Sequence, residues 1–273
     1  MRPSKGLGQN FLLDEGAYRC ILKAAELAAD DLVLEIGPGV GSLTRRLAEG
    51  AGKVVTVELD VRMCEVLRDV LQEYPNVHLV EGDILKLDPV EALCSASGLS
   101  PRQLRYKVVA NLPYYITSAV LRHLLGARVR PALLVLTVQK EVAQRIVAAP
   151  GRLSMLAISV QVFGEPQIVC RVPARAFYPR PKVDSAVLRV RVYPTPLVPE
   201  EELPRFFKVV RAGFAQKRKQ IHNCLVHGLL LPRQKVLEAL QHVGISPARR
   251  AQMLTIEEWL ALSRALPLDE ETS

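Results

Sequence analysis

The sequence lacks the long apolar runs that membrane insertion and secretion require. Its most apolar stretch, residues 132–138, is far too short to span a bilayer. No apolar run follows the basic residues near the first methionine, so no secretory signal is predicted. We expect a cytoplasmic protein, and the prior removal of an organellar presequence is the alternative left open.

The sequence also lacks closely spaced metal ligands. The five cysteines stand far apart and the five histidines are scattered, whereas zinc sites and redox pairs need short spacings such as C-x-x-C. We therefore predict no metal site, and we expect all five thiols to be free in a reducing compartment, mostly as small buried side chains.

Acidic residues are fewer than basic ones. The chain of 273 residues has 36 Lys and Arg against 28 Asp and Glu, a formal net charge of +8. Such an excess favours a polyanionic partner, of which nucleic acid is the commonest, over charge that serves solubility alone.

Short apolar runs alternate with helical patterns from residue 32 to about 192. The first five runs are rich in Val and Leu, as strands buried on both faces are, and lie at 32–36, 53–58, 77–80, 107–110 and 133–138. This alternation predicts an α/β fold with a doubly wound, mostly parallel sheet. Three later runs have no helix between them and predict antiparallel strands at one edge, at 157–163, 167–172 and 186–192.

A proline-rich joint at 193–199 marks a domain boundary. Helical periodicity follows it, at 203–214, 220–227, 234–243 and 256–265. Thr255 stands three residues before Glu258, as in a capping box. We predict an α/β domain over residues 1–194 and a small α-helical domain over 195–273.

The first strand ends in the glycine loop EIGPGVG, which begins at Glu35. Gly37 and Gly39 allow a sharp turn and a close approach of the backbone to a ligand. The spacing is G-x-G-x-G rather than the dinucleotide fingerprint G-x-G-x-x-G, and it looks like the loop of S-adenosylmethionine methyltransferases. A purely structural turn is the alternative.

Acidic residues follow the next two strands. Glu58 ends the second strand and can accept hydrogen bonds from both ribose hydroxyls of a nucleoside. Asp60 is the alternative acid, but we expect it to begin the next helix. After the third strand, Asp83 can accept from an adenine amine while the backbone N–H of Ile84 meets a ring nitrogen. These positions predict a nucleoside-containing cofactor.

The motif NLPY, from Asn111 to Tyr114, follows the fourth strand. The Asn111 amide oxygen and the Leu112 carbonyl can accept the two hydrogens of an adenine N6 amine and polarise a poorly nucleophilic nitrogen. Tyr114 can stack on the base, which must be flipped out or unpaired. Phe177, in the proline-braced segment FYPRPKVDS, can supply the second ring of a sandwich around the base, with a core anchor as the alternative.

The order GQNFL, EIGPGVG, Glu58, GDI, NLPY, F-x-P-x-P-x-V-x-S and a basic helical tail resembles the ribosomal RNA adenine dimethyltransferase family over nearly the whole chain. The match is closer to its housekeeping small-subunit branch than to its erythromycin-resistance branch. Tyr115 departs from the bacterial members, which often carry Asn there.

The resemblance implies a Rossmann-like domain with a mostly parallel seven-stranded sheet, and S-adenosylmethionine as the cofactor. It implies that Gln9, Asn10 and Leu12 belong to a segment that folds over this cofactor. It also implies dimethylation of N6 on two adjacent adenosines near the 3′ end of small-subunit (16S) rRNA, linked to subunit biogenesis. The partner would be the immature small subunit and the enzyme a monomer.

RNA affinity should come mainly from basic side chains on phosphates. The candidates are Lys217, Arg218, Lys219, Arg249, Arg250 and the N-terminal Arg2 and Lys5, each with a solvated helix face as the alternative. Three other functions stay open: a large-subunit methyltransferase of the erythromycin-resistance type, a non-catalytic RNA-binding assembly factor, and an NAD-dependent oxidoreductase. The glycine spacing disfavours the last.

Overall fold

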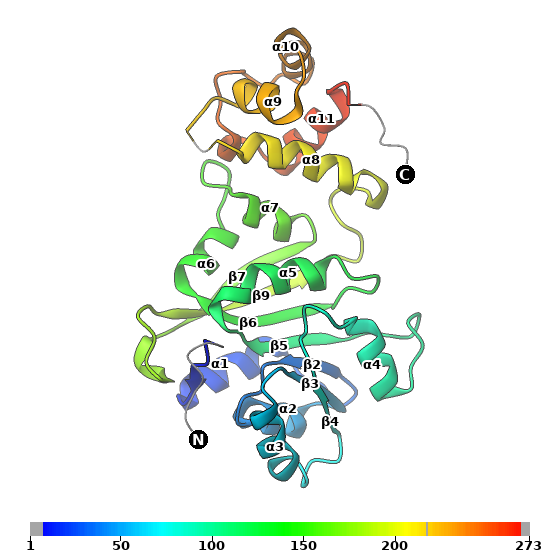
Figure 1. Cartoon of the computed structure of the whole chain (residues 1–273), viewed down its shortest axis with the longest axis vertical. Coiled ribbons are helices and arrows are strands. Elements are labelled where there is room, and N and C mark those ends of the chain that lie inside the picture. The colour runs from blue at the N-terminus through cyan, green and yellow to red at the C-terminus, as the bar shows by residue number, and fades with distance from the viewer. Residues whose placement is uncertain (1–7, 217, 269–273) are drawn as a thin grey trace. The chain divides into compact units, whose positions relative to one another are not determined.

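Residues 8–216 and 218–268 are described by the computed structural model shown in Figure 1. Arg2, Lys5 and Lys217, predicted to contact RNA, lie outside these residues. By its internal contacts the chain divides into two compact units, the first formed by residues 1–144 and 164–194 and the second by 145–163 and 195–273. The sequence predicts segment 145–163 within the α/β domain, whereas its contacts group it with the helical unit.

The first unit is built on a seven-stranded sheet with the strand order β4-β3-β2-β5-β6-β9-β7 (Figure 1). Its strands are β2 (Leu32–Ile36), β3 (Lys53–Glu58), β4 (Val77–Glu81), β5 (Lys107–Asn111), β6 (Leu133–Gln139), β7 (Gly164–Val172) and β9 (Ser185–Val192). The five strands from β4 to β6 are parallel neighbours, whereas β9 runs antiparallel to both β6 and β7. The predicted fold class is confirmed.

Helices connect the parallel strands, as the right-handed βαβ connection requires. The connecting helices are α2 (Ser42–Gly50), α3 (Val61–Val70), α4 (Pro89–Ser97) and α5 (Thr117–Leu125). Helix α1 (Glu15–Ala25) precedes β2 and α6 (Lys140–Ile146) follows β6, and two short 3-10 turns are η1 (Tyr114–Ile116) and η2 (Ala174–Ala176). A separate two-stranded ribbon joins β1 (Phe11–Leu12) to β8 (Phe177–Tyr178).

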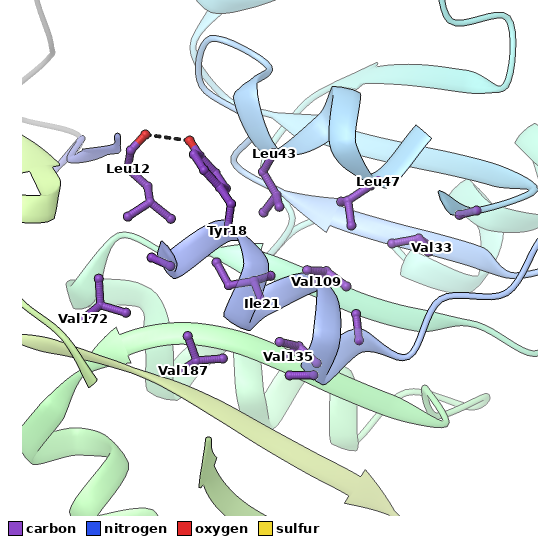
Figure 2. Packing of buried hydrophobic residues seen from close by; sticks show 14 of the residues in the cluster. Leu12, Tyr18, Ile21, Val33, Leu43, Leu47, Val109, Val135, Val172 and Val187 are labelled. Carbon is purple, nitrogen blue, oxygen red and sulfur yellow. Dashed lines mark hydrogen bonds between the residues drawn. The ribbon is translucent and has the colours of Figure 1, made fainter. Parts of the chain in front are cut away.

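One face of the sheet packs against α1 and α2. Val33, Val109, Val135 and Val187 share this face because strand side chains alternate, and Ile21 of α1 packs on them (Figure 2). All five side chains are essentially buried. Burying each stabilises the fold by about 1.5–3 kcal/mol relative to exposure, so this layer holds α1 against the sheet.

The second unit is helical. Its helices are α7 (Met155–Gln161), α8 (Leu203–Phe214), α9 (Ile221–Leu229), α10 (Arg233–His242) and α11 (Ile256–Ala265), with 3-10 turns η3 (Glu200–Glu202) and η4 (Ala251–Met253). The four helices predicted after the proline joint are confirmed. Thr255 and Glu258 form both hydrogen bonds of the predicted capping box at the start of α11.

The strand predicted at 157–163 is wrong, because residues 157–161 lie in α7 and residues 162 and 163 form the turn that follows it. Ser154 caps the helix by accepting from the backbone N–H of Ala157. Residues 156–160 are all buried, and a helix buried on every side has no polar stripe. Its sequence is then indistinguishable from a buried strand by periodicity alone.

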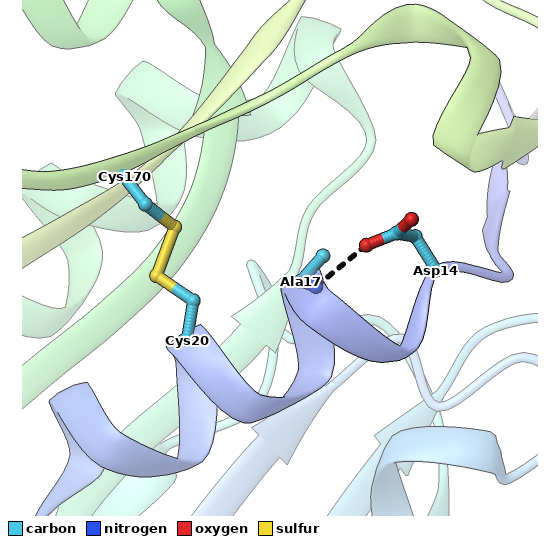
Figure 3. Close-up of a disulfide and its surroundings, with 4 residues drawn as sticks. All are labelled: Asp14, Ala17, Cys20 and Cys170. Atoms are coloured by element: carbon cyan, nitrogen blue, oxygen red, sulfur yellow. Dashed lines mark hydrogen bonds between the residues drawn. A yellow bond between two sulfur atoms is a disulfide. The ribbon is translucent and has the colours of Figure 1, made fainter.

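The expectation that all five thiols are free is also wrong. Cys20 of α1 and Cys170 of β7 form a disulfide although 150 residues separate them in the sequence (Figure 3). Helix α1 lies against β7, and the two Cα atoms are 6.8 Å apart. Sequence spacing carries no information about two cysteines that only the tertiary structure brings together. Cys64, Cys94 and Cys224 are free.

Candidate functional site

A cavity opens at the carboxyl ends of the parallel strands. From β2 the chain continues to β3 and β4 on one side of β2, and it then returns to β5 and β6 on the other side. The direction in which strands are added to the sheet therefore reverses between β2 and β5. Open α/β sheets bind ligands at such a switch point. The cavity is lined by residues 8–12, Tyr18, 35–40, Ser42, Leu43, 57–59, 82–85 and 111–116.

The glycine loop lines this cavity. Gly37 and Gly39 have φ angles of +70° and +58°, a region that side-chain-bearing residues rarely adopt. A Cβ at Gly37 would meet no atom within 4 Å, so the backbone there faces open space. A Cβ at Gly39 would lie 2.8 Å from the ring of Phe11. The loop therefore presents bare backbone to a ligand on one side and to the N-terminal segment on the other.

Glu58 lies at the end of β3 with only 6% of its surface exposed. Its Oε2 accepts from the backbone N–H of Gly39 at 3.1 Å and its Oε1 accepts from that of Asp60 at 2.9 Å. Burial raises the pKa of its carboxyl group, while these two N–H donors act in the opposite direction. Each oxygen keeps a lone pair for a further donor, as recognition of a ribose diol needs.

Asp60 has the structural role expected of it. It caps α3 by accepting from the backbone N–H of Arg62 and it also binds the Arg62 guanidinium. Its Oδ2 accepts from the Gln9 amide at 3.1 Å. The predicted cofactor residue Gln9 thus anchors the N-terminal segment to the start of α3.

Glu35, at the start of the glycine loop, is 1% exposed and lines the cavity. The Thr56 hydroxyl donates to its Oε2 at 2.9 Å. Loss of hydration raises the pKa of Glu35 to about 7, and the neighbouring Glu58 carboxylate adds to this rise. Glu35 therefore changes its charge close to neutral pH, next to the space where a cationic ligand would sit.

Asp83 and Ile84 line the cavity after β4. Asp83 Oδ1 accepts from the backbone N–H of Leu85 at 3.0 Å, which fixes the carboxylate in a turn. Ile84 is 5% exposed. Both lie where the sequence predicts contacts to the adenine of a cofactor.

Asn111 lies at the end of β5 and is oriented by the N-terminal segment. Its Nδ2 donates to the backbone carbonyl of Asn10 at 3.0 Å. This bond leaves the amide oxygen of Asn111 as the group that can accept from a ligand. Asn10 therefore orients the Asn111 side chain through its backbone carbonyl. The sequence does not reveal this contact, because 101 positions separate the two residues.

Leu112 and Tyr114 line the same cavity. The Leu112 side chain is 2% exposed and so anchors the NLPY turn in the core. The Tyr114 ring is half-buried and its hydroxyl lies 2.7 Å from the buried Ser185 hydroxyl. Burial raises the pKa of Tyr114.

Phe177 does not line the cavity in this structure. It is 4% exposed and belongs to the hydrophobic cluster with Leu12, Val172 and Val187. This position agrees with the alternative of a core anchor, and stacking of Phe177 on a base stays a prediction. The adjacent Tyr178 is 60% exposed.

Two site residues were missed by sequence analysis. Tyr18 of α1 lines the cavity and its hydroxyl donates to the Leu12 carbonyl at 2.6 Å, as Figure 2 shows. Ser185 holds the Tyr114 hydroxyl. Ser185 ends the motif F-x-P-x-P-x-V-x-S, so the motif signals its importance, but only the pairing of β6 with β9 brings it to Tyr114.

The basic residues of the helical unit that are predicted to contact RNA differ in exposure and in their pairing with other residues. Arg218, Lys219 and Arg250 are exposed. Arg249 instead pairs with both carboxylate oxygens of Glu258 and donates to the Met253 carbonyl. Arg249 is therefore engaged in holding η4 and α11 together.

The sheet order, the bare glycine loop and the buried acid at the end of β3 define a Rossmann-like S-adenosylmethionine-dependent methyltransferase. The residues fit this cofactor, because Gly37 leaves room for a ligand against the backbone and Glu58 retains acceptor capacity. The chain belongs to the ribosomal RNA adenine dimethylase family, whose family model matches residues 2–267.

Curated relatives cover almost the whole chain. It is 45% identical over 262 residues to the ribosomal RNA small subunit methyltransferase A of Dehalococcoides mccartyi strain 195, covering 96% of this chain and 88% of that protein. It is 46% identical over 267 residues to the protein of the same name from Moorella thermoacetica, covering 97% and 92%.

Solved structures share the fold. The 23S rRNA methyltransferase ErmE matches with a TM-score of 0.73 and 33% identity, covering 95% of this chain and 100% of that chain. A dimethyladenosine transferase from Plasmodium falciparum matches with a TM-score of 0.75 and 29% identity, covering 92% and 95%. Within the described residues, no helix is both long and apolar enough to cross a membrane.

Proposed function

We propose that this enzyme transfers methyl groups from S-adenosylmethionine to N6 of two adjacent adenosines near the 3′ end of small-subunit rRNA. The observation that carries the proposal is the orientation of Asn111, whose Nδ2 is held by the Asn10 carbonyl so that its oxygen is free to accept. The higher identity to small-subunit relatives, 45–46% against 33% for ErmE, supports the small-subunit target.

The cofactor would supply a methyl group on a sulfonium, which is an excellent leaving group. Glu58 would hold the ribose, and Asp83 with the Ile84 backbone would hold the adenine. The chain's main contribution to the reaction is then orientation, because in-line attack by a correctly placed amine needs little acid–base help.

The Asn111 oxygen and the Leu112 carbonyl would accept the two N6 hydrogens and draw the nitrogen towards a tetrahedral form. Their effect would grow along the reaction, because the N6 hydrogens become more acidic as the new bond forms. Tyr114 would stack on the flipped base, with Phe177 as the predicted second ring. After transfer the nitrogen can lose its proton to water, and the methylated amine must rotate before a second round.

We further propose that the substrate is an immature small ribosomal subunit in the cytoplasm and that the enzyme acts as a monomer. Arg218, Lys219 and Arg250, which are exposed, would contribute phosphate contacts together with Lys217. A non-catalytic assembly role on the same scaffold would need these contacts but not the Asn111 oxygen.

The test offers labelled S-adenosylmethionine to unmethylated small subunits and, separately, to unmethylated large subunits. The proposal predicts label on two adjacent adenosines of the small-subunit rRNA. Label on the large subunit would establish the erythromycin-resistance type of activity instead. Binding without transfer would support the assembly factor.

A further inference from the structure

A basic segment with an exposed aromatic ring, residues 173–184, lies between β7 and β9. Arg175, Tyr178, Arg180 and Lys182 are all exposed in it. Asp184 is the only acidic residue between positions 173 and 192, and its carboxylate is taken by the Arg171 guanidinium and the Ala174 N–H. No ion pair of the described residues involves Arg180 or Lys182. The segment therefore presents positive charge that the protein itself does not neutralise.

Strand pairing places this segment beside the cavity. In the antiparallel ribbon of β1 and β8, Phe11 stands directly opposite Tyr178 and Leu12 opposite Phe177. Directly opposed side chains lie on the same face, about 4.5–5.5 Å apart at Cβ. Phe11 and Leu12 both line the cavity, so β8 runs beside a strand of the cavity wall. Tyr178, which is 60% exposed, shares one face of the ribbon with Phe11, while Leu12 and Phe177 share the other face and are buried.

The backbone of the segment is already ordered. The Leu13 N–H donates to the Ala176 carbonyl at 2.8 Å and extends the ribbon. Pro179 and Pro181 alternate with Tyr178, Arg180 and Lys182, and proline restricts the backbone on either side of each exposed residue. Binding a ligand here would cost little backbone entropy.

We propose that this segment is a docking surface for the RNA strand on either side of the target adenosine. The Tyr178 ring stacks on a nucleotide next to the flipped base, and Arg180 and Lys182 contact the flanking phosphates. Aromatic rings set among cations are the means by which proteins hold unpaired RNA, because every base offers a π-face and every nucleotide a phosphate. The inference rests on the proposed RNA substrate and adds a contact surface in the sheet unit.

The rival interpretation is that Tyr178 only completes the β1–β8 ribbon and that the cations only keep the surface hydrated. The two interpretations differ in what the side chains do in the presence of RNA. The ribbon is paired through its backbone, so Tyr178→Ala should leave it formed, and thermal unfolding of the variant checks this.

The experiment measures binding of the full chain to fluorescently labelled, unmethylated small ribosomal subunits over a range of salt concentrations. The variants are Tyr178→Ala, Tyr178→Phe and the double variant Arg180→Gln/Lys182→Gln. The matched control is Arg102→Gln/Arg105→Gln. Both control residues are exposed and precede β5, at the end of the parallel strands opposite the cavity. Their substitution removes two positive charges, as the Arg180→Gln/Lys182→Gln variant does.

Tyr178→Ala should weaken binding roughly 10-fold, within the range known for loss of one stacked base, and Tyr178→Phe should bind as the wild type does. The Arg180→Gln/Lys182→Gln variant should flatten the slope of log affinity against log salt by about 1.4, the value for two phosphates on a single strand. The control pair should leave the slope unchanged.

The docking surface is refuted if Tyr178→Ala binds within about twofold of wild type and the double variant shows the same slope as its control. Equal flattening by both pairs also refutes it, because the effect would then be one of net charge. These binding results do not depend on methyl transfer. A wild-type protein that binds subunits with the predicted pattern but transfers no methyl would overturn the proposed function and leave the docking surface standing.

Discussion

The hydroxyl of Tyr114 lies 2.7 Å from the hydroxyl of Ser185, which is completely buried in β9. This bond joins the NLPY turn at the end of β5 to the end of the FYPRPKVDS motif, two segments that the sequence separates by 71 positions. The hydrogen bond holds the hydroxyl end of the Tyr114 ring, while the backbone turn holds the Cβ end of the same side chain. The plane on which the base would stack is therefore set by both motifs.

We predict that Ser185→Ala and Tyr114→Phe each slow methyl transfer about 3- to 10-fold, since a hydrogen bond contributes on the order of 1 kcal/mol. The double variant should be no slower than the slower single variant, because both changes remove the same bond. Single-turnover rates on saturating subunits give this cycle. Fully additive effects would show that the two hydroxyls act separately.

Glu58→Ala should weaken S-adenosylmethionine binding by roughly 2–4 kcal/mol without unfolding the protein, because a charged acceptor of two ribose hydroxyls is lost. Glu58→Gln, which keeps one acceptor oxygen, should lie between Glu58→Ala and the wild type. Isothermal titration measures both, with circular dichroism as the check on folding. Unchanged affinity in a folded Glu58→Ala variant would remove this residue from the cofactor site.

Cofactor affinity should depend on pH through Glu35. Since burial raises its pKa to about 7, Glu35 is mostly neutral at pH 6 and mostly ionised at pH 8. The ionised form attracts the sulfonium, so the affinity for S-adenosylmethionine should rise as pH increases through 7. The rise should be smaller for S-adenosylhomocysteine, which has no sulfonium charge. A Glu35→Gln variant that keeps the full rise would assign it to another group.

Arg249 should behave differently from the other basic residues that are predicted to contact RNA. Its pairing with Glu258 lowers the pKa of that carboxyl group and stabilises the cap of α11. Arg249→Gln should therefore lower the melting temperature while changing the salt slope of RNA binding little. Neutralising Lys217, Arg218 and Lys219 together should flatten that slope by up to about 2–3 units and leave the melting temperature nearly unchanged. The reverse pattern would make Arg249 the phosphate contact.

Local signals in the sequence predicted much of this structure. The apolar runs predicted the parallel strands, and the Thr255–Glu258 spacing predicted the capping box of α11. The strand ends then placed Glu58, Asp83 and Asn111 around one cavity. All of these follow from residues that are close in sequence or from a general rule of parallel sheets.

What could not be predicted depends on contacts between distant segments. The helix α7 is buried on all sides and carries no polar stripe, so its apolar run was interpreted as a strand. The Cys20–Cys170 disulfide exists only because α1 packs beside β7. In the same way, the bond from Asn111 to the Asn10 carbonyl requires the N-terminal segment to cross the ends of the strands.

The central claim is that the Asn111 oxygen polarises the adenine amine. Asn111→Ala should leave cofactor and RNA binding nearly intact and cut methyl transfer by about two orders of magnitude or more, on the order of 3 kcal/mol of transition-state stabilisation. Tyr114→Ala is the contrast, because loss of stacking should weaken capture of the base as well as the rate, by roughly 1–3 kcal/mol in binding.

The most direct measurement is the single-turnover rate of the Asn111→Ala variant on saturating unmethylated small subunits with saturating S-adenosylmethionine. Saturation removes differences in binding, so the rate reports the transfer step alone. We predict a rate at least about 100-fold below that of the wild type, in a protein that still binds both ligands. Transfer at the wild-type rate would contradict the account and reduce NLPY to a structural turn.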